Sequence, residues 1–257
     1  GKAHADLGDA ARAEQAYRDA IASSPQQLLA WQGLLTLISS TPDSALHKRI
    51  EVLSAVRPLL RAEGDAAKHA DAVAKLREAA AQASDAASRD AAVAALRALS
   101  ADEGEDAGVR HDLSLHAQLV ALLEAAESAA IEKTVDSERR SLRVTEKPAE
   151  IRRRVTLAAQ ATSGVDVAIE AALALPTAAA DMAASAALRV RLVRRGLARL
   201  RLLPEGDAAR AAYASVMAAA EALLASGAPV DADVALALLA HQFATSDADA
   251  LPARARI

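Results

Sequence analysis

Histidine has the widest chemistry of the residue types in this chain, because its ring can bind a metal or transfer a proton near neutral pH. The chain contains six histidines. His111 and His116 are five positions apart, which on one helix separates their directions by about 140°, so they cannot share a metal ion. His47 and His69 lie near acidic residues, but no HExxH or other metal-ligand spacing surrounds them. We therefore expect surface or packing histidines and no bound metal.

Other catalytic patterns are missing from the sequence as well. It contains no GxxxxGK[ST] or GxGxxG loop for phosphates and no GxSxG nucleophile elbow. An enzyme would need a nucleophile and an oriented base in one pocket, and no spacing here predicts such a pair. The sequence favours a protein without catalysis, cofactor or small-molecule substrate.

The sharpest local pattern is a run of arginines along one predicted helix. Arg191, Arg195 and Arg199 recur every four residues and therefore share a face. Arg194 lies beside them. These side chains could contact RNA phosphates or an acidic surface of a partner. The alternative is a solvated helix face, which the acidic net charge of −4 and the scarcity of aromatic stacking groups favour. Residues 152–154, all arginine, have the same two interpretations.

The composition indicates an all-α protein. Hydrophobic residues make up 53% of the chain but aromatic residues only 2%, because alanine, leucine and valine dominate. Alanine is the best helix former, and the residues that favour strands are sparse. Cysteine is absent, so no disulfide or thiolate metal site can form. No apolar run reaches the roughly 18 residues of a membrane-spanning helix, so we expect a cytoplasmic protein without membrane contact.

The first 35 residues place small and large side chains at the spacing of a two-helix repeat. Ala13 and Ala20 allow close approach of two helices, and Tyr17 fills the space between them. Residues 8–9, Gly-Asp, predict a turn, because glycine adopts positive φ and aspartate can cap the next helix. Residues 23–25, Ser-Ser-Pro, predict the end of that helix.

These residues coincide in one register with the packing positions of the 34-residue tetratricopeptide repeat, or TPR. The seven matching positions are Gly1, Ala13, Tyr17, Ala20, Pro25, Trp31 and Leu34. In this register the chain begins inside the first helix of a repeat, and the next repeat starts at Leu28. A chance alanine-rich hairpin is the alternative, but Trp31 and Pro25 do not follow from the alanine-rich composition.

The second repeat is degenerate. Its first helix is predicted over 28–38, with Leu35 at the glycine position, and 39–43 form the turn. Leu46, Ile50 and Leu53 fit the packing positions of its second helix if one residue is deleted. Pro58 then marks the end of that helix or kinks it.

Beyond residue 65 the repeat fades, while apolar residues still recur at spacings of three and four. Proline and glycine separate helices predicted at 66–83, 88–99, 113–133, 149–161, 165–175, 179–202, 207–225 and 230–244. An acidic loop is predicted at 104–108 and a charged hinge at 144–148. The fold class is an α-solenoid of TPR and degenerate TPR-like helix pairs. Its expected segments are a TPR region (1–64), irregular helical repeats (65–143) and a second helical segment (144–257).

The order of several segments resembles one family. Residues 29–34, Leu-Ala-Trp-Gln-Gly-Leu, follow directly after the first repeat and resemble the N-terminal arm of the large TPR subunit of the superkiller (Ski) complex. The double-arginine segment 138–142, preceded by Ile-Glu-Lys at 131–133, resembles a charged segment of that arm. Residues 188–241 resemble a later part, with Leu-Leu-Pro-Glu-Gly at 202–206. Tyrosines, phenylalanines and lysines of the arm are largely replaced here by alanine, leucine and arginine.

The resemblance implies a scaffold of RNA decay. The large TPR subunit of that family holds a DExH-type RNA helicase and WD-repeat subunits, and the complex feeds mRNA into the cytoplasmic exosome for 3′-to-5′ decay. The arm contacts the exosome side and helps to gate the helicase. Any RNA contact of the arm would be indirect.

Two other roles remain open from the sequence. The first is a peptide-binding TPR adaptor of the co-chaperone type, which clamps a C-terminal carboxylate with asparagine and lysine on the first helix of a repeat. The corresponding helix has Gln32 and Thr36, and the chain contains no asparagine. The second is a helical-repeat protein with another role.

Overall fold

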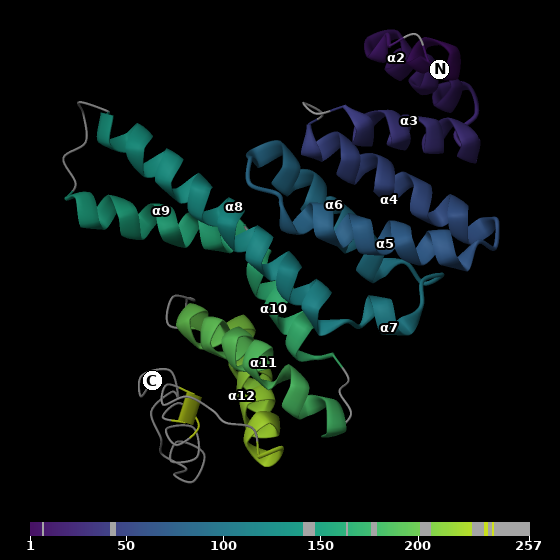
Figure 1. Cartoon of the computed structure of the whole chain (residues 1–257). Helices are drawn as coiled ribbons and strands as arrows, with labels where there is room; N and C mark the ends of the chain where they lie inside the picture. Colours follow the sequence, from purple (N-terminus) through teal and green to yellow (C-terminus); the bar gives the residue numbers. More distant parts are fainter. Residues whose placement is uncertain are drawn as a thin grey trace, which may run out of the picture. The chain divides into compact units, whose positions relative to one another are not determined.

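Every regular element in the described part of the chain is an α-helix (Figure 1). The structure is a computed structural model that describes residues 1–6, 8–41, 45–140, 147–162, 164–175, 179–200, 207–227, 234–235 and 238. The all-α prediction is confirmed for these residues. None of the helices they form is long and apolar enough to cross a membrane.

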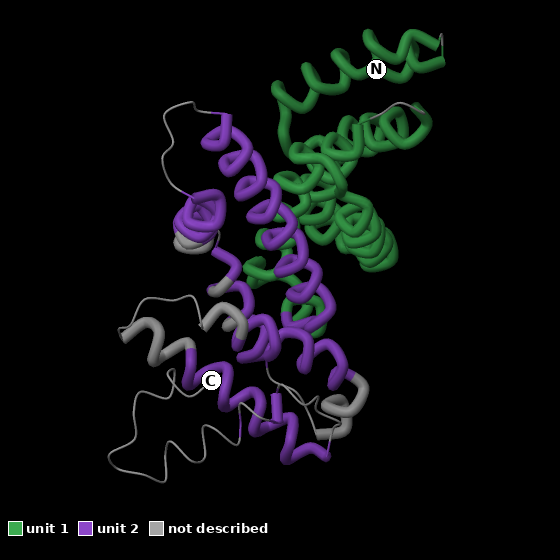
Figure 2. The backbone as a smooth tube through the Cα atoms, turned by 90° about the vertical axis from the view of Figure 1, so that its left-hand side faces the viewer, with its two compact units in different colours: residues 1–110 green, residues 111–257 purple. Residues whose placement is uncertain are grey.

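The chain divides into two compact units, Gly1–Arg110 and His111–Ile257, which are coloured separately in Figure 2. The predicted boundary after residue 64 lies inside the first unit. The predicted boundary between 143 and 144 lies outside the described residues.

The first unit is a succession of helices in which each packs on the next along the chain. Its helices are α1 (Lys2–Asp6), α2 (Ala10–Ser23), α3 (Leu28–Ser40), α4 (Leu46–Ala62), α5 (Ala66–Ala81), α6 (Ala86–Ala101) and α7 (Ala107–Arg110). In addition, α4 packs on α6 as well as on α5. This second contact makes α4 the helix that joins the first helices of the unit to the last ones.

The turn before α2 has the predicted chemistry. Gly8 has a φ of 74°, which glycine adopts without steric cost. The Asp9 carboxylate caps α2 by accepting a hydrogen bond from the backbone N–H of Arg12 at 3.1 Å. At its other end α2 stops at Ser23, directly before the predicted Ser-Pro break. The predicted start and end of this helix are thus confirmed.

One apolar cluster of the first unit lies between α3, α4 and α5. Its buried residues are Leu34, Ile38, Val52, Val56, Leu60 and Ala72, and Tyr17, Ile21, Leu28, Trp31 and Leu35 pack against them. Complete burial of one such leucine or isoleucine stabilises the fold by about 2 kcal/mol. The contiguous apolar side chains therefore bind α2 through α5 into one body.

The segment predicted as a degenerate second repeat forms the helix pair α3 and α4. Ile50 and Leu53 are buried at 0% and 1% exposure, and Leu46 is half-buried. Helix α3 ends at Ser40, two residues beyond its predicted end, and 42–44 of the predicted turn lie outside the described residues. Pro58 lies inside α4, which continues to Ala62. The proline therefore does not end the helix.

The second unit contains longer helices. They are α8 (Leu113–Arg140), α9 (Pro148–Thr162), α10 (Val165–Leu173), α11 (Ala179–Leu200) and α12 (Asp207–Ala225). Helix α8 packs on α9, α10 and α11, and α12 packs on α10 and α11. Gly196 of α11 permits the close approach of α12, because a Cβ at this position would lie 2.7 Å from a methyl carbon of Val216.

Helix boundaries differ from prediction where tertiary packing adds contacts. Helix α8 continues seven residues beyond its predicted end at 133, because Val135 is buried against Ile151 and Val155 of α9. The short α7 forms within and after the predicted acidic loop 104–108. Most of the helix predicted at 230–244 lies outside the described residues.

Candidate functional site

Tyr17 lies where three helices meet in the first unit. A Cβ added to Gly33 of α3 would lie 2.4 Å from Cε1 of the Tyr17 ring, and a Cβ on Gly1 would lie equally close. Real Cβ atoms do not approach a ring so closely, so a side chain at either position would displace the ring. Tyr17 thus packs against glycines on both sides.

The other residues of the predicted register divide into buried and half-exposed positions. Ala13 and Leu34 are buried at 0% and 1% exposure. Trp31 is half-buried, and its indole Nε1–H donates to the backbone carbonyl of Pro25 at 2.8 Å. Ala20 is half-buried, and the ring of Pro25 is exposed. Trp31 is therefore held by the loop that separates α2 from α3 and not by a ligand site.

An ion pair joins α2 to α4. Lys48 Nζ lies 2.9 Å from Glu14 Oε1, and the two residues are 34 positions apart. Arg18 also donates to Glu14, at 3.0 Å. The bond from Lys48 lowers the pKa of the Glu14 carboxyl. The ion pair therefore ties α2 to α4, two helices that are not adjacent along the chain.

Beside this ion pair lies a shallow groove of about 220 Å³ between α2, α3 and α4. Its lining includes Ala10, Ala11, Leu37, Ile38, Thr41 and the Glu14–Lys48 pair. The Thr41 hydroxyl donates to the backbone carbonyl of Leu37 at 2.8 Å. Because Thr41 is engaged with its own helix and both charged groups are paired, the groove presents no nucleophile with an oriented base.

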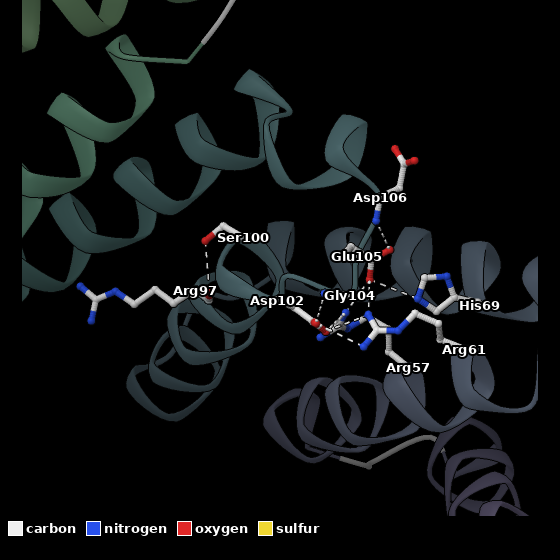
Figure 3. A network of polar contacts seen from close by, with 9 residues as sticks. All are labelled: Arg57, Arg61, His69, Arg97, Ser100, Asp102, Gly104, Glu105 and Asp106. Carbon is white, nitrogen blue, oxygen red and sulfur yellow. Dashed lines mark hydrogen bonds and ion pairs between the residues drawn. The ribbon is translucent and has the colours of Figure 1, made fainter.

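The buried charged residues of the first unit, Arg57 and Glu105, belong to an ionic cluster that also contains Arg61, His69 and Asp102 (Figure 3). The Arg57 side chain is 4% exposed and the Glu105 side chain 2%. Arg57 Nη1 donates to Glu105 Oε2 at 2.5 Å and lies 2.8 Å from Asp102 Oδ2. Charge-assisted bonds of this kind are the strong ones in proteins.

Arg61 and His69 complete the ionic cluster. The Arg61 guanidinium makes a two-pronged contact with Asp102, at 2.9 and 3.2 Å. This contact lowers the pKa of Asp102 from 3.8 to about 2, with a further contribution from Arg57, and raises the pKa of Arg61. His69 Nε2 lies 3.2 Å from Glu105 Oε2. The five side chains therefore tie the segment between α6 and α7 to α4 and α5.

The contacts of the ionic cluster fit a structural role. His69 beside Glu105 has the composition of an acid–base pair, but the cluster includes no hydroxyl nucleophile and is packed among helices. In the part of the chain that the structure describes, no group of three or more His, Cys, Asp or Glu residues is arranged to hold a metal ion.

No sequence pattern predicts the ionic cluster. Arg57 and Arg61 are more than forty positions from their carboxylate partners. The available signal was Arg57 itself, a charged residue on the apolar side of α4 between Val56 and Leu60. A buried arginine there requires carboxylate partners from another element.

The arginine helix α11 is partly occupied by contacts within the second unit. Arg195 forms an ion pair with Glu124 of α8. Arg191 and Arg194 are exposed, and the side chain of Arg199 lies outside the described residues. The four arginines predicted on this helix therefore do not all present free charges, because Arg195 is paired with Glu124.

Arg189, which the sequence argument did not single out, is buried on the same helix. It is 5% exposed and donates to the backbone carbonyl of Leu175 at 3.2 Å. Its Nε lies 3.4 Å from the Ser185 hydroxyl, and burial lowers the pKa of the guanidinium. One arginine of α11 therefore secures the chain before that helix.

Comparison of the chain with protein-family models, curated proteins and solved structures finds no match.

Proposed function

We propose that this chain is a non-catalytic helical-repeat scaffold that holds other proteins. The observation that carries the proposal is the succession of helices α1 to α7, each packed on the next along the chain, with the Tyr17 ring against Gly1 and Gly33. Helical hairpins that stack one after another make an extended surface, and repeat proteins use such surfaces to bind partners. Residues 1–64 would then be TPR and degenerate TPR, followed by TPR-like helix pairs of a solenoid.

The more specific proposal is the N-terminal arm of a Ski-type scaffold. Its support is the order of segments in the sequence: the Trp31 segment, the double arginine at 139–140 and the later Leu-Leu-Pro-Glu-Gly segment at 202–206. In this role the chain would act in the cytoplasm. Its partners would be a DExH-type RNA helicase, a WD-repeat subunit and the exosome side of the assembly.

The proposal is tested by co-purification. The gene that encodes this chain is expressed at full length with an affinity tag, together with the DExH-type helicase and WD-repeat subunit of the same organism. We expect both subunits to co-purify through repeated washing at moderate salt. An unrelated TPR protein with the same tag serves as the control. Recovery of neither subunit would refute the Ski-type role, and a different stable partner would leave the general scaffold role intact.

A peptide titration separates the scaffold from a carboxylate-clamp adaptor. The Thr36 hydroxyl donates to the backbone carbonyl of Gln32 at 2.9 Å, so this polar group of α3 is engaged with its own helix. A fluorescent peptide ending in Glu-Glu-Val-Asp should therefore show no saturable binding. Micromolar binding that is lost when the terminal carboxylate is amidated would establish the adaptor instead.

A further inference from the structure

The hairpin of α8 and α9 differs in charge from the rest of the chain. Residues 132–140 and 147–154, called the basic hairpin below, contain seven Lys or Arg and four Asp or Glu, a formal charge of +3. The whole chain carries −4, so the remaining residues carry −7. A segment with the opposite sign to its own protein attracts anionic partners locally while the remainder repels them.

The basic hairpin is held together by a small core with an ion pair at each flank. Val135, Ile151 and Val155 are buried at 0%, 2% and 5% exposure between the two helices. On one flank Arg152 donates to Glu132 at 2.9 and 3.2 Å. On the other flank Arg154 donates to Glu138 at 3.2 and 2.6 Å. These contacts neutralise two arginines and two glutamates and fix α9 on α8.

Five cations of the basic hairpin remain outside these pairs. Lys133, Arg139, Arg140, Lys147 and Arg153 are exposed, and no ion pair joins them to another residue in the part of the chain that the structure describes. The acids left without a paired arginine are Asp136 and Glu150. The surplus of positive charge is thus concentrated on side chains that the fold itself does not use.

The helical period sets the directions of three of these cations. Lys133 and Arg140 are seven positions apart and share one side of α8, about 150° from the direction of buried Val135. Arg153 lies about 180° around α9 from the mean direction of Ile151 and Val155. All three therefore face away from the seam between the helices, where a partner can reach them.

We propose that the basic hairpin binds an acidic segment of a partner protein. Arginine presents a planar fork of donors that matches a carboxylate with two hydrogen bonds, and three of the five available cations are arginines. Residues 132–154 contain no Phe, Tyr or Trp, so the surface has no platform for stacking bases of single-stranded RNA. The chemistry favours Asp- or Glu-rich protein over nucleic acid. This inference goes beyond the scaffold role and does not depend on the Ski-type assignment.

The test measures binding of a fluorescein-labelled polyglutamate peptide to the full 257-residue chain by fluorescence anisotropy. The variant Arg139→Glu with Arg153→Glu reverses two cations that have no carboxylate partner. The matched control is Lys2→Glu with Arg97→Glu, two exposed cations of the first unit. Both double variants change the formal charge by the same amount. Circular dichroism confirms that both fold.

We expect the parent chain to bind the peptide saturably and more weakly as the salt concentration rises. The affinity for the peptide should fall at least about tenfold in the hairpin variant and change by no more than about twofold in the control. An equal loss in both variants would show attraction to overall charge and overturn the assignment to the hairpin. Absence of binding in the parent chain would overturn the proposal. Binding of single-stranded or hairpin RNA without binding of polyglutamate would overturn the choice of a protein partner.

A second measurement locates the contact without substitution. A carbodiimide couples a carboxylate to a lysine that touches it, and of the chain's six lysines Lys133 and Lys147 belong to the basic hairpin. Lys48, Lys68 and Lys75 are already paired with Glu14, Asp65 and Asp71. We expect the polyglutamate peptide to couple to Lys133 and Lys147. Coupling mainly to Lys2 would contradict the proposal.

Discussion

At the residue scale, the Tyr17 ring occupies its position because its neighbours Gly1 and Gly33 have no Cβ atom. The ring occupies space that a single methyl group on Gly33 or Gly1 would enter. An aromatic side chain contributes a large buried area, and its rigid ring transmits any displacement to the helices around it. The spacing between α2 and α3 is therefore sensitive to one carbon atom.

Gly33→Ala tests this packing. The new Cβ would lie 2.4 Å from the Tyr17 ring, so the ring or helix α3 must move. Overpacking of this kind costs about 1–3 kcal/mol, which exceeds the gain of about 1 kcal/mol from replacing a helical glycine by alanine. We expect a lower free energy of unfolding in urea, monitored by Trp31 fluorescence.

Two controls define the cause of that effect. Thr36→Ala changes an exposed position of the same helix and should be neutral or slightly stabilising. Adding Tyr17→Leu to Gly33→Ala removes the ring and should recover part of the lost stability. If Gly33→Ala is as stable as the parent, the ring does not limit the approach of α3.

The ionisation of Asp102 makes the stability of the fold depend on pH in the acid range. Its pKa is lowered from 3.8 in the unfolded chain to about 2 in the fold, mainly by Arg61. A carboxyl with a depressed folded pKa adds stability above its unfolded value, and this stability is lost as the pH falls from about 4 to about 2. The contribution at neutral pH is about 2 kcal/mol.

The corresponding prediction concerns Asp102→Asn. The variant should be less stable than the parent at pH 6, and the difference should shrink as the pH falls toward 2, measured by urea unfolding across that range. Asp71→Asn removes an exposed carboxylate paired with Lys75 and should change little at any pH. If the difference in unfolding free energy between Asp102→Asn and the parent stays constant down to pH 2, the pKa of Asp102 is not lowered by the fold.

At the element scale, the ionic cluster replaces apolar packing where α4 meets the segment between α6 and α7. Removing one partner of a buried pair leaves an uncompensated charge and costs about 3–5 kcal/mol, whereas removing both can cost far less. Arg57→Leu should therefore destabilise the first unit strongly. Backbone amides of 102–110 should exchange hydrogen faster than in the parent, as measured by mass spectrometry.

The double variant Arg57→Leu with Glu105→Leu is the control for that experiment. It removes both charges, so its stability should lie closer to the parent than that of Arg57→Leu alone. Arg61→Gln affects a side chain that is 33% exposed and should cost less than Arg57→Leu. Additive losses in the double variant would show that Arg57 and Glu105 are not coupled.

Elements with local signals were predictable from the sequence, whereas clusters made over long distances were not. The turn at Gly8 and Asp9 and the helix Asp207–Ala225 follow from glycine, aspartate and proline next to the helix itself. The extension of α8 past residue 133 depends on burial of Val135 by α9, which no local propensity encodes. The ionic cluster similarly needs contacts between residues more than forty positions apart.

At the scale of the whole molecule, the chain has two compact units, and each contains buried apolar residues. Leu53 is buried in the first unit at 1% exposure, and Leu192 is buried in the second at 2%. Two compact units of one chain need not unfold in one transition. Trp31, the single tryptophan, lies in the first unit and reports on that unit, whereas far-UV circular dichroism reports on helices of both.

We therefore predict that urea unfolding followed by Trp31 fluorescence and by circular dichroism gives curves that do not coincide. Leu53→Ala should lower the fluorescence midpoint, because truncation of a buried leucine costs about 2–5 kcal/mol. Leu192→Ala has the same chemistry in the other unit and should shift only the circular dichroism curve. If Leu192→Ala moves the fluorescence midpoint as far as Leu53→Ala does, the two units unfold as one cooperative body.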